Sequence, residues 1–394
     1  MEGFKHKRPQ FKTLKNRLKE PRRFIQCLLG PRQIGKTTLI RQILETFPTK
    51  SSLYFSADDP AMQSHEWIRQ KWLEARLLEK QQKKDIFLVF DEIQKITSWS
   101  DVVKSLWDED TRKRTKIKVA ILGSSPLLPQ KGLTESLAGR FEVLRLGHWS
   151  FAEMKKAFGF GIDEYIYYGA YPGAAALIHD EVRWRDYIVN ALAETVLLKD
   201  ILLNHQINKP ALLRQLYALA TQYSGQILSF QKMLGQLHDA GNTTTLAHYL
   251  ELLSVAGLVS GLQKFSANTL RKRLSSPKLQ VQNTALMANS LGESFSNIKE
   301  TTHWGRIVES CVGAYLWNLC FQEGGELYYW NEQSKEVDFV LKKNNKIIAI
   351  EVRSGHKTGH IKSLETFRKK HTPDETLVVG GEGIPLTDFL KMTF

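Results

Sequence analysis

The chain up to about residue 150 alternates between short apolar runs and longer amphipathic stretches. Between the runs, apolar residues recur at helical spacing in 39–44, and a charged helical stretch is predicted at 61–84. Strands that alternate with helices predict an α/β fold with a parallel sheet. The apolar runs are typical of buried strands and lie at 24–29, 53–55, 86–90 and 119–122.

The later part of the chain is helical first and strand-rich afterwards. A helical pattern runs from about 151 to 203. A further helix is predicted at 212–219, a short one is capped by Ser229, and one begins in the cap-rich run Asn242–Thr245 and ends at Gly257. A helix at 303–320 then precedes strands at 326–330, 336–341 and 346–353, and the last two strands are joined by a turn at Asn344–Asn345.

A glycine-rich run follows the first predicted strand. It reads Gly30-Pro31-Arg32-Gln33-Ile34-Gly35-Lys36-Thr37-Thr38, which has the glycine, Lys and Thr spacing of a phosphate-binding loop. A helix begins directly after it, so backbone N–H groups and the positive end of that helix converge on one place. In such a loop Lys36 reaches the β- and γ-phosphates, and the Thr37 hydroxyl ligates Mg²⁺. These residues are therefore predicted to bind ATP and Mg²⁺.

Two adjacent carboxylates, Asp91 and Glu92, end the apolar strand at 86–90. They repel each other in a poorly solvated place unless a cation is present, so this pair predicts the second half of a nucleotide site. Asp91 is expected to hold the Mg²⁺ shell together with Thr37, and Glu92 to polarise the attacking water.

Two further residues are candidates for sensing the nucleotide. Ser124 follows the strand at 119–122, where a polar side chain can meet the γ-phosphate. Arg140 lies in a stretch expected to be helix-like and is a candidate sensor of transferred charge, either in its own subunit or across a subunit boundary. The alternative for Arg140 is an ordinary surface ion pair.

These motifs, in this order, resemble those of the AAA+-type prokaryotic ATPases that pair a P-loop domain with a C-terminal domain of unknown function. The resemblance covers nearly the whole chain and implies ATP binding, slow hydrolysis, a helical lid, a winged helix and a nuclease-like C-terminal fold. Besides the glycine loop it rests on Val89-Phe90-Asp91-Glu92-Ile93-Gln94, Gly123-Ser124-Ser125, Ser136-Leu137-Ala138-Gly139-Arg140, His148-Trp149-Ser150 and Tyr168-Gly169-Ala170-Tyr171-Pro172-Gly173.

The predicted domain organisation combines these patterns with the resemblance. Residues 206–295 follow the winged-helix plan of helix, helix, capped helix and hairpin, with the helix after Asn242 as the reader. However, no Lys or Arg lies between Gly241 and Gln263, so DNA contacts would need Thr244, Thr245, His248 and the basic loop Arg271–Arg273. A DNA reader and a packing or lid element both stay open as functions of this segment.

The four predicted domains are a P-loop ATPase domain with a basic N-terminal arm at 1–150, a helical lid or connector at 151–205, a winged-helix-like domain at 206–295 and a C-terminal domain at 296–394.

The C-terminal domain resembles the PD-(D/E)XK nuclease fold. Glu351 interrupts an apolar strand, and a buried carboxylate costs several kcal/mol unless a cation or donors meet it. Asp338 and Glu309 could complete a second metal site with it. Arg353 stands where the fold usually has Lys, and Arg cannot act as a base. An active nuclease and an inactive fold with a buried ion network both stay open.

Composition and charge indicate the class of partner and the cellular compartment. The formal net charge of +14 favours polyanionic partners such as DNA. The Lys- and Arg-rich first 23 residues could form an arm that contacts phosphates or, alternatively, a solvated lead-in helix. The three cysteines lack metal-type spacing, which is typical of a reduced, cytoplasmic protein. The N-terminus lacks the apolar core of a secretory signal, and no apolar run is long enough to span a membrane.

The sequence therefore predicts a Mg²⁺-dependent ATP hydrolase that couples nucleotide state to the binding of DNA or a protein partner. One alternative is an ATP-regulated switch with little turnover. Another is an ATP-coupled DNA nuclease that uses Glu309, Asp338 and Glu351. Whether the protein forms a homo-oligomer stays open.

Overall fold

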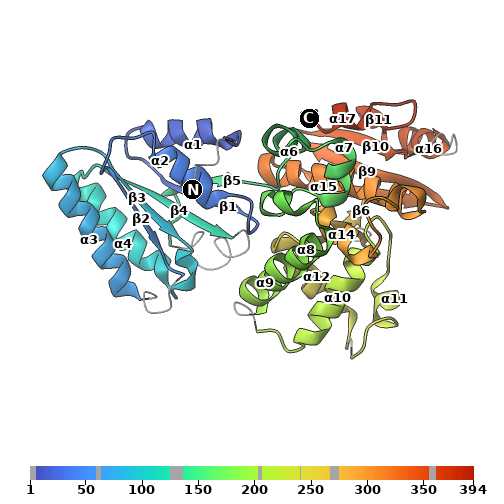
Figure 1. The fold of residues 1–394 in the computed structure, drawn as a ribbon, viewed down its shortest axis with the longest axis horizontal. Helices are drawn as coiled ribbons and strands as arrows, with labels where there is room; N and C mark the ends of the chain where they lie inside the picture. The colour runs from blue at the N-terminus through green and yellow to red at the C-terminus, as the bar shows by residue number, and fades with distance from the viewer. Residues whose placement is uncertain are drawn as a thin grey trace. The chain divides into compact units, whose positions relative to one another are not determined.

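The computed structural model describes residues 6–58, 64–124, 136–202, 206–239, 241–266, 275–354 and 361–394 (Figure 1). The chain forms two compact units, 1–146 and 147–394. Two parts of the motifs noted in the sequence, Ser125 and the basic loop Arg271–Arg273, lie outside the described residues. In the ranges described, no helix combines the length and apolar character needed to cross a membrane.

Unit 1 is built on a parallel sheet of five strands in the order β2-β3-β4-β1-β5. The predicted parallel α/β fold and all four predicted strands are confirmed, because each apolar run forms a strand of this sheet. The strands are β1 Ile25–Gly30, β2 Ser52–Ser56, β3 Ile86–Asp91, β4 Ile117–Ser124 and β5 Phe141–Arg145. The helices are α1 Gln10–Lys19, α2 Lys36–Leu44, α3 His65–Gln82 and α4 Trp99–Lys113, with a 3₁₀ turn at Ile93–Lys95.

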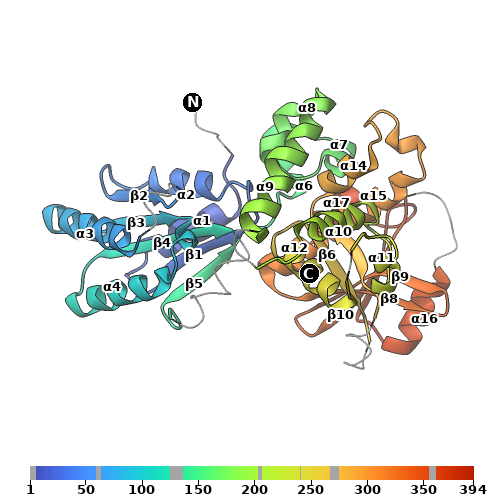
Figure 2. The ribbon, with the colours of Figure 1, turned by 90° about the horizontal axis from the view of Figure 1, so that it is seen from below.

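Helices cover both faces of this sheet, as Figure 2 shows. Successive side chains of a strand point to opposite faces. In β3, Leu88 and Phe90 pack with α3 and α4, whereas Phe87 and Val89 pack with α1 and α2. Burial on both faces explains why the strands read as continuous apolar runs in the sequence.

One expectation for unit 1 is wrong. Residues 136–140 were expected to be helix-like, but the structure has turns there, directly before β5. Gly139 has a left-handed φ of 74°, and the N–H of Arg140 donates to the carbonyl of Leu137 to close the turn. A left-handed residue ends helical geometry, so the chain can reverse into the strand.

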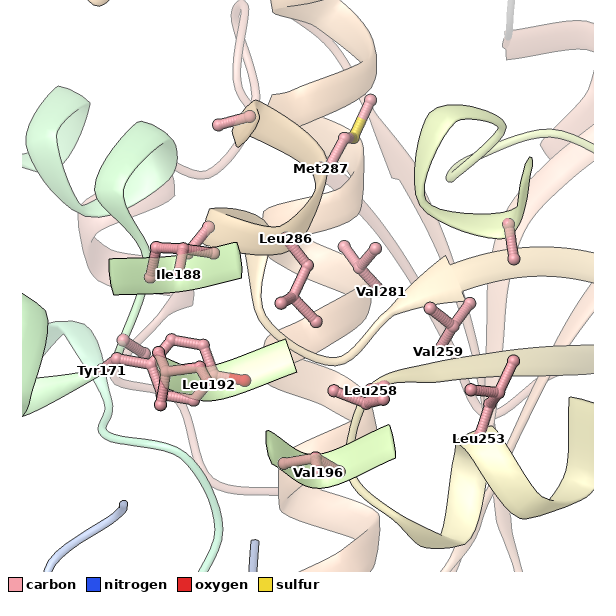
Figure 3. Close-up of a cluster of buried hydrophobic side chains, with 14 of the residues drawn as sticks. Tyr171, Ile188, Leu192, Val196, Leu253, Leu258, Val259, Val281, Leu286 and Met287 are labelled. Atoms are coloured by element: carbon pink, nitrogen blue, oxygen red, sulfur yellow. The ribbon is translucent and has the colours of Figure 1, made fainter. Parts of the chain in front are cut away.

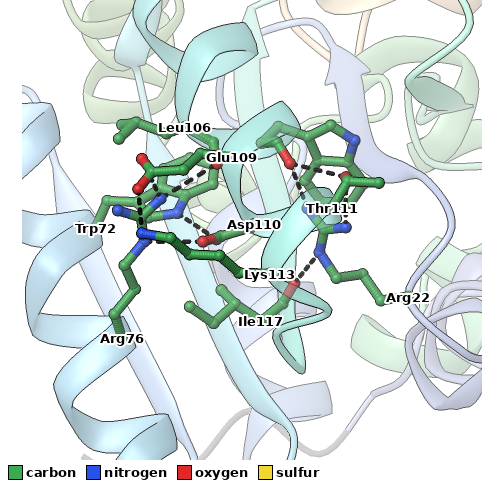
Figure 4. A network of polar contacts seen from close by, with 10 residues as sticks. Arg22, Trp72, Arg76, Leu106, Glu109, Asp110, Thr111, Lys113 and Ile117 are labelled. Atoms are coloured by element: carbon green, nitrogen blue, oxygen red, sulfur yellow. Dashed lines mark hydrogen bonds and ion pairs between the residues drawn. The ribbon is translucent and has the colours of Figure 1, made fainter.

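A buried polar network fixes α4 against its neighbours (Figure 4). The carboxylate of Asp110 is fully buried and accepts hydrogen bonds from Trp72 Nε1 at 2.7 Å and from Arg76 Nε at 2.8 Å. On the other side of the helix, Arg22 donates to the carbonyl oxygens of Trp107 and Ile117, both at 2.9 Å. The α3–α4 contact and the entry to β1 are therefore specified by hydrogen bonds as well as by apolar packing.

Unit 2 begins with a helical segment and continues into a domain with a mixed sheet. The long helical run from α8 to residue 202 contains two π-helical segments, Tyr187–Ala193 and Leu197–Leu202, and π-helical turns are rare. The helices are α6 Phe151–Phe158, α7 Ile162–Tyr168, α8 Glu181–Asp186, α9 Glu194–Val196, α10 Pro210–Gln222, α11 Phe230–Leu234, α12 Thr243–Val255, α14 Thr284–Leu291, α15 His303–Glu323, α16 Ile361–His371 and α17 Leu386–Phe389, with 3₁₀ turns at Pro172–Leu177 and Ile298–Glu300.

The predicted helix caps of this unit are confirmed. The side chains of Ser229 and Asn242 accept hydrogen bonds from the N–H groups of Lys232 and Thr245. Gly257, directly after the last capping residue of α12, has a left-handed φ of 85°. Such a residue ends the helix and turns the chain into β6.

The mixed sheet has six strands in the order β11-β10-β9-β8-β6-β7. Strand β6 pairs with β7 in antiparallel orientation and with β8 in parallel orientation, through Gln263 and Lys264 opposite Tyr328 and Tyr329. The β6–β7 pair, from the region predicted to be winged-helix-like, thus shares one sheet with the C-terminal strands. The strands are β6 Val259–Lys264, β7 Lys278–Val281, β8 Glu326–Glu332, β9 Lys335–Lys343, β10 Lys346–Val352 and β11 Glu375–Val379.

One apolar core joins the helical segment of unit 2 to the β6–β7 pair (Figure 3). Ile188 and Leu192 come from the π-helical segment and share the core with Val259, Val281 and Leu286. Burying these side chains together stabilises the helical segment and the sheet as one body.

Candidate functional site

The glycine-rich loop lies between the end of β1 and the start of α2. Gln33 and Gly35 have left-handed φ angles of 58° and 89°, and the loop turns sharply at them. A Cβ atom on Gly30 would lie 2.1 Å from the carbonyl oxygen of Leu146, so only glycine fits there. The first N–H groups of α2 have no acceptor within the helix and face the end of the loop. This geometry suits a bound anion.

The ammonium group of Lys36 is held against the loop. Its Nζ donates to the carbonyl oxygens of Gly30 at 2.9 Å and Pro31 at 2.7 Å, and the side chain is buried. These two carbonyl oxygens hold the ammonium group at the edge of the sheet where β1 ends.

The structure brings Thr37 and Asp91 together, from α2 and β3. Oδ2 of Asp91 accepts a hydrogen bond from Thr37 Oγ1 at 2.9 Å and another from the hydroxyl of Tyr54. Both Thr37 and Asp91 offer the oxygen ligands that Mg²⁺ prefers, so this pair could hold one ion. Asp91 itself is buried, with 6% of its surface exposed.

Tyr54 is a site residue that the sequence analysis missed. It lies in β2, two residues before Ser56, and Ser56 is paired with Asp91 of β3. Burial, and then the hydrogen bond to Asp91, raise the pKa of the Tyr54 hydroxyl, so the phenol remains a donor at neutral pH. The guanidinium of Arg41 lies 5.0 Å from the centre of its ring.

Glu92 leaves the strand with an unusual backbone conformation. Its φ and ψ are 56° and 26°, in the left-handed region, which costs about 1–3 kcal/mol for a residue with a side chain. Oε2 of its carboxylate accepts a hydrogen bond from Gln94 Nε2 at 2.9 Å and lies 3.5 Å from Arg32 Nη2. The carboxylate is thus fixed beside the loop by an amide and a guanidinium, of which Gln94 was not predicted as a site residue.

Ser124 lies beside the loop, and Arg140 lies at the other edge of the sheet. In the register of β1 and β4, Ser124 is paired with Gly30. The backbone carbonyl of Arg140 accepts a hydrogen bond from the N–H of Ile25, at the start of β1. Because the loop follows the other end of β1, Arg140 lies one strand length from it. Its guanidinium forms two hydrogen bonds to Asp108, at 2.7 and 3.0 Å, which lower the pKa of that carboxyl. The structure does not bring Arg140 to the loop of its own chain.

The basic N-terminal arm contributes one unexpected contact. Arg8 is buried, and its Nη1 donates to the carbonyl of Ile34 in the loop at 3.3 Å. Residues 10–19 form the lead-in helix α1, which buries Leu14 and Leu18 against the sheet. The arm therefore supports the loop, although the sequence pattern indicated only a phosphate-contacting or solvated segment.

A second group of charged residues gathers in unit 2. The structure brings Glu309 of α15, Asp338 of β9 and Glu351 of β10 together, as the sequence indicated, but adds Glu336 and Lys278. Nζ of Lys278 lies 2.7 Å from the Glu309 carboxylate, 2.9 Å from Glu336 and 3.5 Å from Asp338. We call these five residues the Lys278 cluster.

Burial dominates the chemistry of the Lys278 cluster. It is the largest cause of the raised pKa values of Glu309, about 7, and of Glu351, about 9, and the nearby Asp338 contributes to both increases. In the described ranges, no group of three or more His, Cys, Asp or Glu side chains is arranged to hold a metal ion. The carboxylates predicted as a second metal site are therefore arranged around an ammonium group.

Arg353, the other residue predicted for this site, has two buried side-chain nitrogens, Nε and Nη2, without hydrogen-bond partners among the described residues.

Three known protein families match successive segments of the chain. Residues 22–155 match the family model described as AAA domain, and this part of the chain is an AAA-type P-loop domain. Residues 160–297 and 304–387 match two families described as domains of unknown function, DUF8612 and DUF4143.

Two relatives have names that state no function. The chain is 26% identical to "Uncharacterized protein MJ1544" of Methanocaldococcus jannaschii, over 86% of this chain and 78% of the relative. It is 28% identical to "Uncharacterized protein Rv2008c" of Mycobacterium tuberculosis, over 84% of this chain and 70% of the relative.

Solved structures show weaker similarity. AMPPCP-bound DnaA from Aquifex aeolicus has a TM-score of 0.33 at 13% identity, over 64% of this chain and 88% of that one. Cdc6p from Pyrobaculum aerophilum has a TM-score of 0.33 at 15% identity, over 74% of this chain and 94% of that one. Scores this low carry no information about the function of this chain.

Proposed function

We propose that the protein is an ATP hydrolase whose nucleotide state controls the binding of a partner. The observation that carries this proposal is the hydrogen bond of 2.9 Å between Thr37 and Asp91. It joins the helix after the glycine loop to the acidic end of β3, which is the arrangement that a Mg²⁺–triphosphate complex needs.

The loop backbone, Lys36, Thr37 and Asp91 each have a role in this proposal. The loop N–H groups and the start of α2 bind the phosphates. Lys36 exchanges the carbonyls of Gly30 and Pro31 for the β- and γ-phosphate oxygens. Thr37 and Asp91 would hold Mg²⁺, which neutralises charge on the phosphate oxygens when it is bound.

Hydrolysis needs a carboxylate that orients water. Glu92 serves this role in the proposal, because Gln94 and the left-handed backbone hold its carboxylate beside the loop. Arg32, 3.5 Å from Glu92, pairs with the carboxylate until the γ-phosphate competes for the guanidinium. Ser124, paired with Gly30, contacts the γ-phosphate. A role for Arg140 would be on the nucleotide of a neighbouring subunit, because it lies a strand length from its own loop.

Duplex DNA is the partner that the charge of the chain favours. The net charge is +14, and helices α10, α11 and α12 followed by the β6–β7 pair have the order of a winged helix. The segment of α12, Thr243–Val255, contains no Lys or Arg, so phosphate contacts would come from elsewhere on the surface.

The test is ATP turnover measured across protein concentration, with and without duplex DNA. We expect Mg²⁺-dependent turnover that Glu92→Gln reduces at least about 10²-fold, while nucleotide binding is retained. Stimulation by DNA that weakens steeply with salt would support DNA as the partner. A wild-type protein that binds ATP and does not turn it over would instead favour the switch without hydrolysis.

Replacement of Tyr54 by phenylalanine is expected to lower the Mg²⁺ concentration needed for half-maximal turnover, by about 2- to 13-fold. The reason is that Asp91 loses one donor that competes with the metal, and such a hydrogen bond contributes about 0.5–1.5 kcal/mol. The measurement is turnover at saturating ATP over a Mg²⁺ titration.

The control for Tyr54→Phe is Tyr165→Phe. Tyr165 is also buried, and its hydroxyl donates to the carbonyl of Trp149 in unit 2, at 3.0 Å. This variant should leave the Mg²⁺ dependence unchanged. An increased Mg²⁺ requirement in Tyr54→Phe would contradict the proposed competition.

A further inference from the structure

The Lys278 cluster contains an unusually buried lysine. Lys278 is the first residue of β7, and its side chain has no exposed surface. Its ammonium group lies among carboxylates from two other elements, Glu309 of α15 and both Glu336 and Asp338 of β9. A buried ammonium group is tolerated only when it is paired in this way.

The backbone on both sides keeps this ammonium group in place. Lys278 is paired with Leu262 across the β6–β7 ladder and with Ile227 through an isolated bridge on its other side. The ring of Phe339 lies 5.3 Å from its Nζ. The side chain therefore has a fixed anchor and packed walls, and it stays among the carboxylates.

The cluster does not fit a divalent cation. Magnesium requires oxygen ligands at about 2.0–2.1 Å, whereas the carboxylates here surround Nζ at 2.7–3.5 Å. Those distances are typical of an ammonium group. Asp338 also accepts the N–H of Val352 at 2.8 Å, so one of its oxygens is already occupied. A metal ion would have to share this space with a positive charge.

The position of the cluster in the chain suggests what it does. Lys278 comes from the segment 160–297, and the four carboxylates come from the segment 304–387, which match different families. The ion pairs therefore cross the line between the two segments, close to the place where β6 joins β8.

We infer that Lys278 is the resident cation of this cluster, that it takes the place of a divalent metal there, and that it ties the β6–β7 pair to the C-terminal sheet. In the C-terminal domain the Lys278 ammonium group then occupies the position of a metal ion, and the domain does not cleave DNA by metal-dependent hydrolysis. The cluster has a structural role in joining two segments of the chain.

The first experiment measures Mn²⁺ binding to the full chain without nucleotide, by electron paramagnetic resonance. It compares the wild-type protein with Glu351→Gln. Equal Mn²⁺ uptake is expected, because the cluster takes no metal in either protein. Greater uptake by the wild type would overturn the inference, and this comparison does not depend on any change to Lys278.

The second experiment uses Lys278→Met, which removes the charge and keeps an apolar stem. This variant is expected to gain about one Mn²⁺ per chain and to lose it again in Lys278→Met/Glu351→Gln. Its melting temperature should fall without metal and recover partly with Mn²⁺. A folded Lys278→Met protein that gains no Mn²⁺ would overturn the claim that the ammonium fills a metal position.

Lys343→Met is the matched control. Lys343 is also a buried lysine of the mixed sheet, and it pairs with the single carboxylate of Glu323. This variant should gain no Mn²⁺. These results do not depend on ATP turnover, so the inference can fail or hold independently of the proposed hydrolase.

Discussion

Replacement of Lys36 by alanine is expected to reduce ATP turnover at least about 10²–10³-fold and to weaken nucleotide binding. The Lys36 ammonium is the cation that the loop holds, 2.9 and 2.7 Å from the carbonyls of Gly30 and Pro31. Loss of one such electrostatic contact from a transition state costs about 2.7–4 kcal/mol. Turnover is measured by phosphate release, and binding by titration with a fluorescent ATP analogue.

The control for Lys36→Ala is another buried lysine of unit 1. Lys118 lies near the start of β4, opposite Phe87, and donates to the carbonyl of Leu18 at 2.9 Å. Lys118→Ala should bind nucleotide normally when equal amounts of folded protein are compared. Normal turnover in Lys36→Ala would rule out this loop as the site of hydrolysis.

Replacement of Asp110 by alanine is expected to destabilise unit 1 by about 3–5 kcal/mol. The change leaves two donors, Trp72 Nε1 and Arg76 Nε, without their buried acceptor, and the largely buried Arg76 keeps the more exposed Glu109, 3.0 Å from its Nη2, as a partner (Figure 4). The measurement is urea unfolding followed by tryptophan fluorescence, because Trp72 reports on the same contact.

Asp108→Ala provides the comparison for Asp110→Ala. Asp108 lies two residues earlier on the same helix and pairs with Arg140 at the surface. Exposed ion pairs contribute about 0–1 kcal/mol, so this variant should unfold close to the wild type. Equal destabilisation by the two variants would contradict the assignment of the Asp110 network as a buried determinant of the fold.

The sequence predicts the loop domain well because its signals are local. The strands of the parallel sheet are buried on both faces, and such strands appear as uninterrupted apolar runs. Lys36, Thr37 and Asp91 follow from the spacing of one loop and the end of one strand. The helix-like expectation at 136–140 was wrong because a single left-handed glycine, Gly139, outweighs the local pattern.

The remaining features depend on pairing between distant segments, which the sequence does not display. Tyr54 reaches Asp91 only through the register of β2 and β3. Likewise, the sequence indicated three carboxylates of the C-terminal domain and directed attention to Arg353 for the positive charge. The charge that meets them is Lys278, on β7, which the fold brings to them from a different segment.

The parallel pairing of β6 with β8 has a consequence for how this chain can be divided. If the chain were cut between residues 297 and 304, where two of the matched families meet, one fragment would keep strands β6 and β7 and the other strands β8 to β11. Both new edges would expose unpaired backbone groups, which favour aggregation. These two segments should therefore be inherited, expressed and evolved as a single unit, even though family models describe them separately.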